Sequence, residues 1–218
     1  VGGSRMISES IAPQILNNGG DIFISTGVDK IYTKDNKCCG VILENGDKIE
    51  SKYVISSAGI QNTLEKFLRD ETSLSGYRDN LNKVQPSFGH ACLYVGFEQT
   101  AQELDLKDTN LWVYPSYDHD LNTETFMNDE SSDFPVFYMS FASAKDPAWV
   151  ENHGNTATLE AIVPTNFNNY SKWKETPWKK RGSEYDDYKA NFTERMINQI
   201  YNQIPHIKDK IAYSELST

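Results

Sequence analysis

Residues 54–68, with the sequence VISSAGIQNTLEKFL, decide how the first part of the chain is interpreted. A short apolar run leads into three very small residues, Ser57, Ala58 and Gly59, and the chain then passes directly into a helical pattern. Small residues between a strand and a helix can allow tight packing, or they can let a cofactor lie against the backbone. The stretch taken alone favours packing, and both interpretations remain open at this point.

The segment before this stretch has the pattern of a nucleotide-binding α/β domain. Ser4 is a suitable N-cap for a helix that ends at residues 17–20, Asn-Asn-Gly-Gly, and Pro13 should kink it. The Asn45-Gly46 pair is a strong hairpin signal. The strands predicted around it are residues 21–25, 30–33, 39–43, 48–50 and 53–56. We therefore expect a partial Rossmann-like domain with a β-meander.

The sequence pattern changes near residue 60, because the predicted helices and strands become longer and aromatic residues become more frequent. Ser183 and Asp186 form a capping-box pattern before a helix over residues 183–204, and Pro205 ends it. Residues 122–133 are polar and are predicted to be a loop. The predicted strands are residues 89–97, 111–114, 136–142 and 157–163. The prediction is a mixed α/β chain with a partial cofactor domain at residues 1–60 and a substrate domain of mixed sheet and helices at residues 61–218.

Composition and charge exclude several classes of protein. The formal net charge is −10 over 218 residues, which argues against nucleic acid as a partner. No apolar run approaches the roughly 18 residues that a membrane span requires. Cys38, Cys39 and Cys92 form no disulfide framework, which favours a reducing, intracellular compartment. The four histidines lack metal-ligand spacing, so no metal site is expected.

Several short motifs along the chain together resemble the superfamily of FAD-dependent carotenoid desaturases, carotenoid isomerases and retinol saturases. In the first part they are residues 2–4 (GGS), 11–13 (IAP), 18–20 (NGG), 28–31 (VDKI), 37–41 (KCCGV) and 54–63 (VISSAGIQNT). Those of the second part are most similar to the retinol saturase branch, and they are residues 143–149 (SAKDPAW), 170–173 (YSKW) and 180–185 (KRGSEY).

The resemblance implies FAD as the cofactor, with NAD(P)H as a candidate reductant. Members of the superfamily begin with a strand, a Gly-x-Gly-x-x-Gly turn and a helix, and this motif is absent here. The chain also begins Val-Gly-Gly-Ser without an initiator Met, so we expect a central fragment of a longer enzyme.

The resemblance also implies roles for particular residues in binding FAD. Residues 57–59 would let the backbone approach the dinucleotide, which reverses the preference for packing. Val28 would contact the adenine through its backbone N–H and C=O, and Gly2 and Gly3 would lie near the flavin.

The residues that could carry catalysis are less distinctive. Asp146 beside Lys145 could form an acid–base pair, although a charged pair in a loop before Pro147 is more typical of a turn. Several aromatic residues could line a tunnel for a polyene, although aromatic residues in strands more often belong to a core. These residues are Trp112, Tyr114, Phe137, Tyr138 and Phe141. We name no catalytic residue, because flavin chemistry is performed mostly by the cofactor.

The function implied by the resemblance is oxidoreduction of a retinoid or carotenoid-like polyene, most like the reduction of a C=C bond. Desaturation or isomerisation of a polyene is an alternative. A second alternative, from a different class, is a non-catalytic module that binds an apolar ligand. An apolar substrate would favour peripheral membrane contact, although the sequence contains no convincing basic amphipathic helix.

Overall fold

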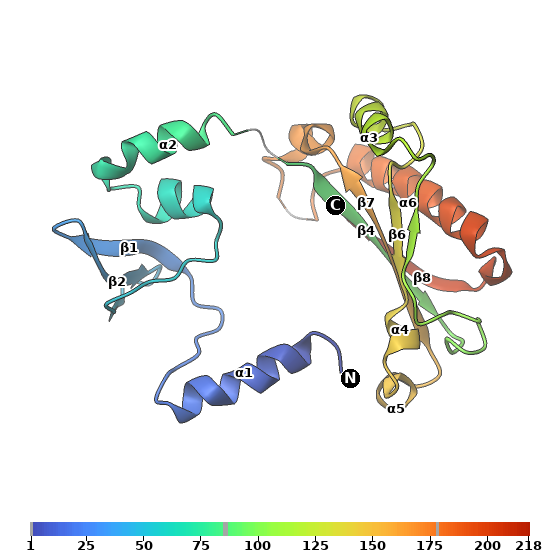
Figure 1. The fold of residues 1–218 in the computed structure, drawn as a ribbon, viewed down its shortest axis with the longest axis horizontal. Coiled ribbons are helices and arrows are strands. Elements are labelled where there is room, and N and C mark those ends of the chain that lie inside the picture. Colours follow the sequence, from blue (N-terminus) through green and yellow to red (C-terminus); the bar gives the residue numbers. More distant parts are fainter. Residues whose placement is uncertain (1, 85–86, 178) are drawn as a thin grey trace. The chain divides into compact units, whose positions relative to one another are not determined.

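The computed structural model describes residues 2–84, 87–177 and 179–218. The chain divides into two compact units. The smaller unit comprises residues 9–87, and the larger comprises residues 88–218 together with the first eight residues. In the sequence, the division falls within helix α1 (Arg5–Asn17), after Ser8. Figure 1 labels the elements of both units.

The smaller unit is built on a three-stranded antiparallel meander. Its strands are β1 (Val28–Lys34), β2 (Lys37–Leu43) and β3 (Lys48–Glu50), in that order. Gly46 has a φ of 91° in the turn between β2 and β3, so the hairpin predicted from Asn45-Gly46 is confirmed. The unit continues with π-helix η1 (Asn62–Phe67), 3-10 helix η2 (Thr72–Leu74) and α2 (Ser75–Leu81).

Two strands predicted for this unit do not form. Residues 21–25 and 53–56 belong to no strand ladder of the described residues. Most of their apolar side chains are exposed, and Ile55 reaches 97% exposure, whereas Val54 is half-buried. A strand is defined by the backbone bonds of a neighbour, and a favourable composition alone does not provide one.

The larger unit contains a five-stranded sheet whose neighbouring strands are all antiparallel. The strands lie in the order β5-β6-β7-β4-β8. Their bounds are β4 (Gly89–Phe97), β5 (Leu111–Val113), β6 (Phe137–Ser140), β7 (Ala157–Thr165) and β8 (Ile211–Ser217). The helices are α3 (His119–Asn128), α4 (Ala142–Lys145), α5 (Trp149–His153), η3 (Phe167–Trp173), α6 (Ser183–Gln203) and η4 (Pro205–Ile207).

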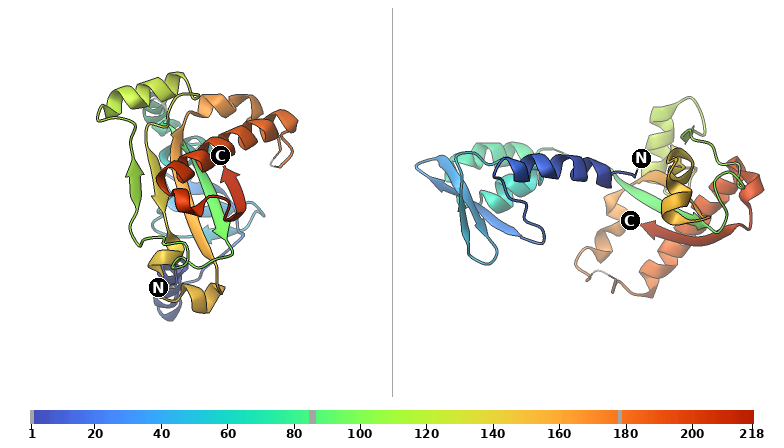
Figure 2. Two further views of the ribbon diagram at one scale, coloured as in Figure 1. Left: turned by 90° about the vertical axis from the view of Figure 1, so that its right-hand side faces the viewer. Right: turned by 90° about the horizontal axis from the view of Figure 1, so that it is seen from below.

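Alternation of side chains along the strands gives this sheet one buried face. Leu93 of β4 and Leu159 of β7 are fully buried in the same core as Met196 and Ile200 of α6. Helix α6 lies along that face of the sheet (Figures 1 and 2). The core is therefore a helix-on-sheet layer, and it fixes which strand residues point to the opposite face.

Other parts of the prediction for this unit were wrong in detail. Residues 122–128 were predicted to be loop and belong to α3, whose N-cap Asp118 accepts a hydrogen bond from the Leu121 N–H (3.0 Å). Strand β8 was not predicted. Helix α6 begins at Ser183 as expected, but its N-cap is Gly182 and the capping box does not form. The mixed α/β fold class is confirmed, and the boundary near residue 60 between a cofactor part and a substrate part stays a prediction.

Candidate functional site

The small residues 57–59 form an exposed turn immediately before a helix. Gly59 has a φ of 85°, and a Cβ built on it would meet no atom within 4 Å. The carbonyl groups of Ala58 and Gly59 accept hydrogen bonds from the side chains of Asn62 (2.9 Å) and Thr63 (2.7 Å). Within the described part of the chain, the three N–H groups of this turn donate to no acceptor. The backbone is thus fixed through its carbonyl groups, and its donors remain open to a ligand.

Val28 lies in the same unit, half-buried at the start of β1 and paired with Leu43. In its neighbour Asp29, the two carboxylate oxygens accept hydrogen bonds from one guanidinium nitrogen of Arg69, at 2.9 and 2.8 Å. Arg69 also donates to the Asp29 carbonyl (2.9 Å). Because Arg69 follows η1 in the chain and η1 packs against β1, this ion pair links the start of β1 to the helix that begins after residue 59.

Gly2 and Gly3 belong to the larger unit. The Gly2 N–H donates to the Asp146 carboxylate (3.0 Å), and a Cβ on Gly2 would lie 2.8 Å from Met6. Gly3 has a φ of 70° and open space around it. The roles of all six candidate cofactor residues, Gly2, Gly3, Val28, Ser57, Ala58 and Gly59, stay predictions.

Asp146 and Lys145 do not form an acid–base pair. Asp146 accepts hydrogen bonds from the backbone N–H groups of Gly2 and Ala148, both at 3.0 Å, and these bonds hold the pKa of its carboxyl below the usual value. Lys145 donates instead to Asn110 and to the Ser140 hydroxyl. An ionised carboxylate that stabilises a turn is a poor proton donor, so the geometry supports the turn-forming interpretation.

The sheet of the larger unit presents an accessible face opposite α6, which we call the open face. Strand register places one row of side chains across four strands, and their identities run from aromatic through aliphatic to thiol: Trp112, Tyr138, Ile162 and Cys92. Trp112 is 61% exposed, and its ring lies 4.6 Å from that of Tyr138. Neighbouring strands are about 4.8 Å apart, so this row extends over about 14 Å. A flat apolar stripe of that length suits an elongated apolar ligand.

The five aromatic residues predicted to line a tunnel lie in three different environments. Trp112 and Tyr138 lie on it, whereas Phe137 and Phe141 are buried in the core at 1% and 2% exposure. Tyr114 is exposed beyond the end of β5 and packs edge-on against His119, with ring centroids 4.4 Å apart. The core interpretation therefore holds for Phe137 and Phe141 only.

A second row on the open face consists of a tyrosine between two glutamates. Register places Tyr94 between Glu160 and Glu215, and Cys92 lies two residues before Tyr94 on the same face. Burial raises the pKa of the Cys92 thiol, and the adjacent Cys92 side chain raises the pKa of Tyr94. Both groups therefore carry their protons at neutral pH. The sequence interpretation missed them, although the alternation of β4 (His90, Cys92, Tyr94) was a usable signal.

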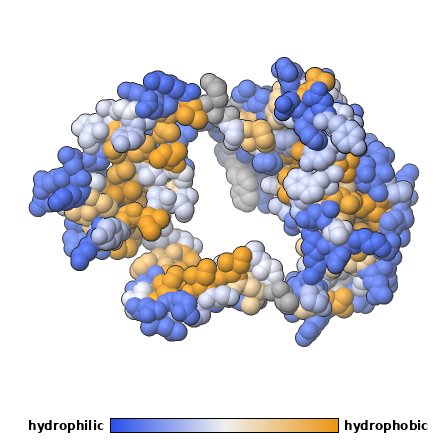
Figure 3. Space-filling model, in the orientation of Figure 1, coloured by the Kyte–Doolittle hydropathy of each residue, from blue (hydrophilic) through white to orange (hydrophobic). Residues whose placement is uncertain are grey.

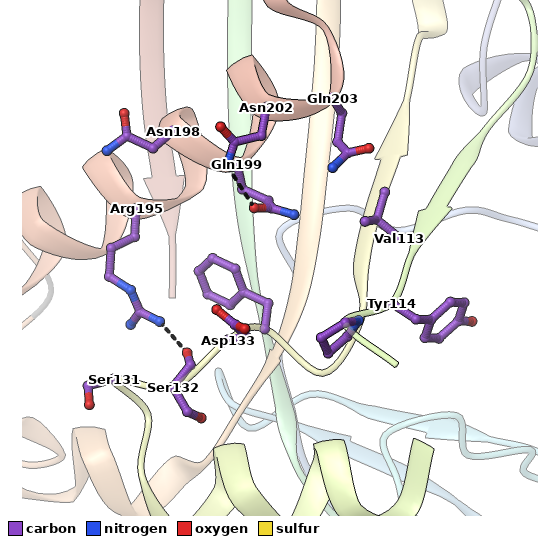
Figure 4. A pocket seen from close by; sticks show the side chains of 12 residues that line it. Val113, Tyr114, Ser131, Ser132, Asp133, Arg195, Asn198, Gln199, Asn202 and Gln203 are labelled. Carbon is purple, nitrogen blue, oxygen red and sulfur yellow. Dashed lines mark hydrogen bonds between the residues drawn. The ribbon is translucent and has the colours of Figure 1, made fainter. Parts of the chain in front are cut away.

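A cavity of about 420 Å³ lies at the side of α6, and its chemistry differs from that of the open face (Figure 4). Amide side chains from α6, those of Asn198, Gln199, Asn202 and Gln203, line much of it. Arg195 donates to the carbonyl groups of Glu130 (2.6 Å) and Ser132 (2.7 Å) and packs over the Phe134 ring. Its guanidinium group is therefore committed to holding the loop before β6, and a cavity this polar does not suit an apolar substrate.

The accessible surface also carries apolar side chains outside the sheet. Ile7, Ile11 and Ile15 recur at four-residue spacing on α1 and are exposed, and Figure 3 shows the stripe that they form. No helix in the described residues is long and apolar enough to cross a bilayer. The same residues contain no group of three or more His, Cys, Asp or Glu side chains able to hold a metal ion.

Comparison with known proteins covers nearly the whole chain. No protein-family model matches it. The chain is 28% identical over 219 residues to human all-trans-retinol 13,14-reductase. The match covers 96% of this chain and 36% of that protein. The chain is similar in sequence to the all-trans-retinol 13,14-reductases. The resemblance to the retinol saturase branch is thereby confirmed, and the chain spans just over a third of the length of the relatives it matches.

Two further relatives show how far the similarity extends. A phytoene desaturase (neurosporene-forming) from Rhodobacter capsulatus is 25% identical over 215 residues, covering 97% of this chain and 39% of that protein. An inactive all-trans-retinol 13,14-reductase from Danio rerio is also 25% identical, covering 97% of this chain and 36% of that protein.

The fold is shared with solved structures, among them the crystal structure of an oxidoreductase from Methanosarcina mazei, with a TM-score of 0.64 and 15% identity. The match covers 99% of this chain and 42% of that protein.

Proposed function

We propose that this chain is part of a FAD-dependent oxidoreductase that reduces one C=C bond of a retinoid or a similar conjugated apolar chain. The observation that carries the proposal is the similarity to all-trans-retinol 13,14-reductase over 96% of the chain. The open face supports it, since it offers a row of about 14 Å that runs from Trp112 to the protonated thiol of Cys92, with the protonated side chain of Tyr94 beside it.

The exposed turn at residues 57–59 fits the negatively charged part of a dinucleotide. Its N–H groups are free within the described part of the chain, and Gly59 leaves room for close approach. FAD, when bound, supplies hydride transfer, and NAD(P)H is the reductant that we propose for it. The turn itself contains only Ser57, Ala58 and Gly59, so it has no acidic side chain that would repel an anion.

The chain's own contribution to the chemistry would be orientation and protonation. Trp112, Tyr138 and Ile162 would hold the polyene along the row and keep water away from it. Reduction of a C=C bond also needs one proton, delivered to the carbon that does not receive the hydride. Tyr94 and Cys92 hold protons next to the row and would supply it, with Glu160 beside Tyr94.

Two relatives support alternative functions. A phytoene desaturase is among the similar proteins, and its name gives the opposite reaction. Desaturation is therefore the first alternative, together with isomerisation, which leaves the mass unchanged. The relative named inactive supports the second, a protein that binds an apolar ligand without turnover.

A lipid-soluble substrate would be taken from a membrane, so the proposal includes an intracellular protein in peripheral contact with a lipid surface. Such contact would not need a spanning helix.

The test uses the complete polypeptide that contains this sequence, with FAD and all-trans-retinol under anaerobic reducing conditions. Products are analysed by mass. A gain of two hydrogens is the expected result. A loss of two hydrogens in a parallel incubation with oxidised FAD and an added quinone as electron acceptor, or an isomer of unchanged mass, would assign the protein to the first alternative. Binding of retinol without any product, with flavin bound and reducible, would assign it to the second.

A further inference from the structure

One short segment of this acidic chain carries a net positive charge. Residues 167–182 contain five basic side chains (Lys172, Lys174, Lys179, Lys180 and Arg181) and one acidic side chain, Glu175, so five minus one gives a net charge of +4. The whole chain has a charge of −10, so the remaining residues together carry −14. A segment with this contrast is a candidate for contact with an anionic partner.

Several described residues of this segment lie with Gly89 and Thr165 at the end of the sheet where β4 begins and β7 ends: Phe167, Tyr170, Trp173, Lys174 and Arg181. Gly89 pairs with Thr165, so Phe88 and Phe167 flank the same end. Both phenylalanine side chains are about half exposed, at 50% and 53%. Phe88 also lies against His90, with ring centroids 5.8 Å apart. Exposed aromatic rings beside lysines are the combination found where proteins contact the interfacial region of a bilayer.

A cavity of about 260 Å³ opens in this region. Its lining combines aromatic and cationic side chains, those of His90, Phe167, Tyr170, Trp173, Lys174 and Arg181. The Nε of Arg181 is buried and has no hydrogen-bond partner within the described part of the chain. Another guanidinium nitrogen of Arg181 donates to the Tyr185 hydroxyl (2.6 Å), which holds the side chain in place. A guanidinium group held in place at the cavity wall contributes a fixed positive charge that would attract a phosphate group.

Two further cations are available at the surface. Lys174 and Lys180 are exposed, and their ammonium groups form no hydrogen bond or ion pair with the described residues. Lys172 differs, because it pairs with Glu184 and lies over the Trp173 ring.

We propose that this end of the larger unit docks on an anionic lipid surface, with a lipid phosphate in the Arg181 cavity and the Phe88 and Phe167 rings in the interfacial layer. We call this region the docking end. The proposed function includes contact with a membrane, and this inference says which surface makes that contact. It rests on the proposed function, because a lipid-soluble substrate is the reason for binding lipid. Its test requires neither flavin nor retinol, so the failure of either proposal can be recognised separately.

Charge and apolarity together favour lipid over nucleic acid. The Debye length is about 10 Å at 0.1 M salt, so acidic residues far from the docking end are screened from a lipid surface beneath it. A nucleic acid groove would follow a longer basic track, whereas this patch is short and is flanked by exposed phenylalanine rings.

The test is co-sedimentation of the 218-residue chain with vesicles at 0.1 M salt. One set contains phosphatidylcholine with 30 mol% phosphatidylserine (about a third anionic lipid, to raise the surface potential), and the other contains phosphatidylcholine only. The variant Lys174→Gln/Lys180→Gln removes two cations from the docking end. The matched control Lys208→Gln/Lys210→Gln removes two exposed lysines beside the start of β8, which pairs with the other end of β4.

A lysine close to an anionic bilayer strengthens binding about fivefold. We therefore expect partitioning onto the anionic vesicles to fall about 25-fold in the docking-end variant and less than about twofold in the control. Phe167→Ser should weaken binding to the same vesicles without changing its salt dependence. Equal binding to neutral vesicles, equal losses in variant and control, or binding of inorganic phosphate or duplex DNA without vesicle binding would overturn the proposal.

Discussion

Replacing Gly59 tests whether the small residues of the turn serve a cofactor or packing. Gly59 has a φ of 85°, and no atom lies within 4 Å of a Cβ built there. Gly46 is a close structural match in the same unit, with a φ of 91° and equally open surroundings. A non-glycine residue in this left-handed region costs roughly 1–2 kcal/mol. Gly59→Val and Gly46→Val should therefore lower the free energy of unfolding by similar amounts.

The two variants should differ only in their affinity for FAD. If the N–H groups of residues 57–59 contact the dinucleotide, the added side chain would displace it and remove at least one hydrogen bond to a charged group. Such a bond contributes about 1.5–3 kcal/mol, which is about 10- to 150-fold in affinity. Gly46 lies in the β2–β3 hairpin, so Gly46→Val should leave FAD affinity within about twofold, a change of no more than about 0.5 kcal/mol.

The assay uses the complete polypeptide, freed of flavin. FAD affinity is measured by titration with flavin fluorescence, and stability by thermal unfolding of the flavin-free form. The reasoning is refuted if both variants lose FAD affinity equally, or if neither loses it. A collapse of the fold confined to Gly59→Val would also contradict it, because the open space around this residue predicts no packing defect.

Three further predictions concern cofactor retention and stability. The isolated 218-residue chain should lose added FAD on gel filtration, because it lacks the Gly-x-Gly-x-x-Gly turn; a stoichiometric flavin band in the protein peak would contradict this. Glu130→Ala should lower the free energy of unfolding by about 1–3 kcal/mol in urea, since its carboxylate accepts the hydroxyl groups of Tyr188 (2.7 Å) and Thr165 (3.0 Å). The exposed control Glu124→Ala should stay within about 0.5 kcal/mol. The pKa of Asp146 is lowered in the folded state, so its contribution to stability is present above the unfolded pKa of about 4 and is lost as the pH falls through the folded pKa. Asp146→Asn should therefore weaken the dependence of the thermal unfolding midpoint on pH in the acid range. An unchanged pH dependence would contradict this.

The parts of the fold that the sequence predicted well are those with a dense apolar pattern. Strand β4 has the predicted bounds, residues 89–97, because every second side chain is buried. Helix α6 was found because its buried residues recur at helical spacing. Helix α3 and strand β8 were missed since each buries a single side chain, Phe126 and Leu216, within an otherwise polar segment. Their stability comes from tertiary contacts that local composition does not reveal.

The candidate site shows a similar division. The turn at residues 57–59 was noticed because small residues between a strand-like run and a helical pattern are visible in the sequence. The open face was not, because alternation shows that a strand has two faces but not which one a helix covers. Phe137 and Tyr138 are adjacent in β6, and only the position of α6 makes one core and the other surface.

The incorrect strand at residues 53–56 and the cofactor hypothesis for residues 57–59 have one physical basis. Val54 and Ile55 carry the β-branched side chains that favour strands, but this preference depends on packing against a neighbouring strand. Within the described residues no strand pairs with this segment, so its backbone makes no ladder hydrogen bonds before the turn. The N–H groups of residues 57–59 consequently remain free, whereas a ladder continued through them would have used some of these donors. The absence of pairing that makes the strand prediction wrong therefore leaves the backbone donors that a dinucleotide would need.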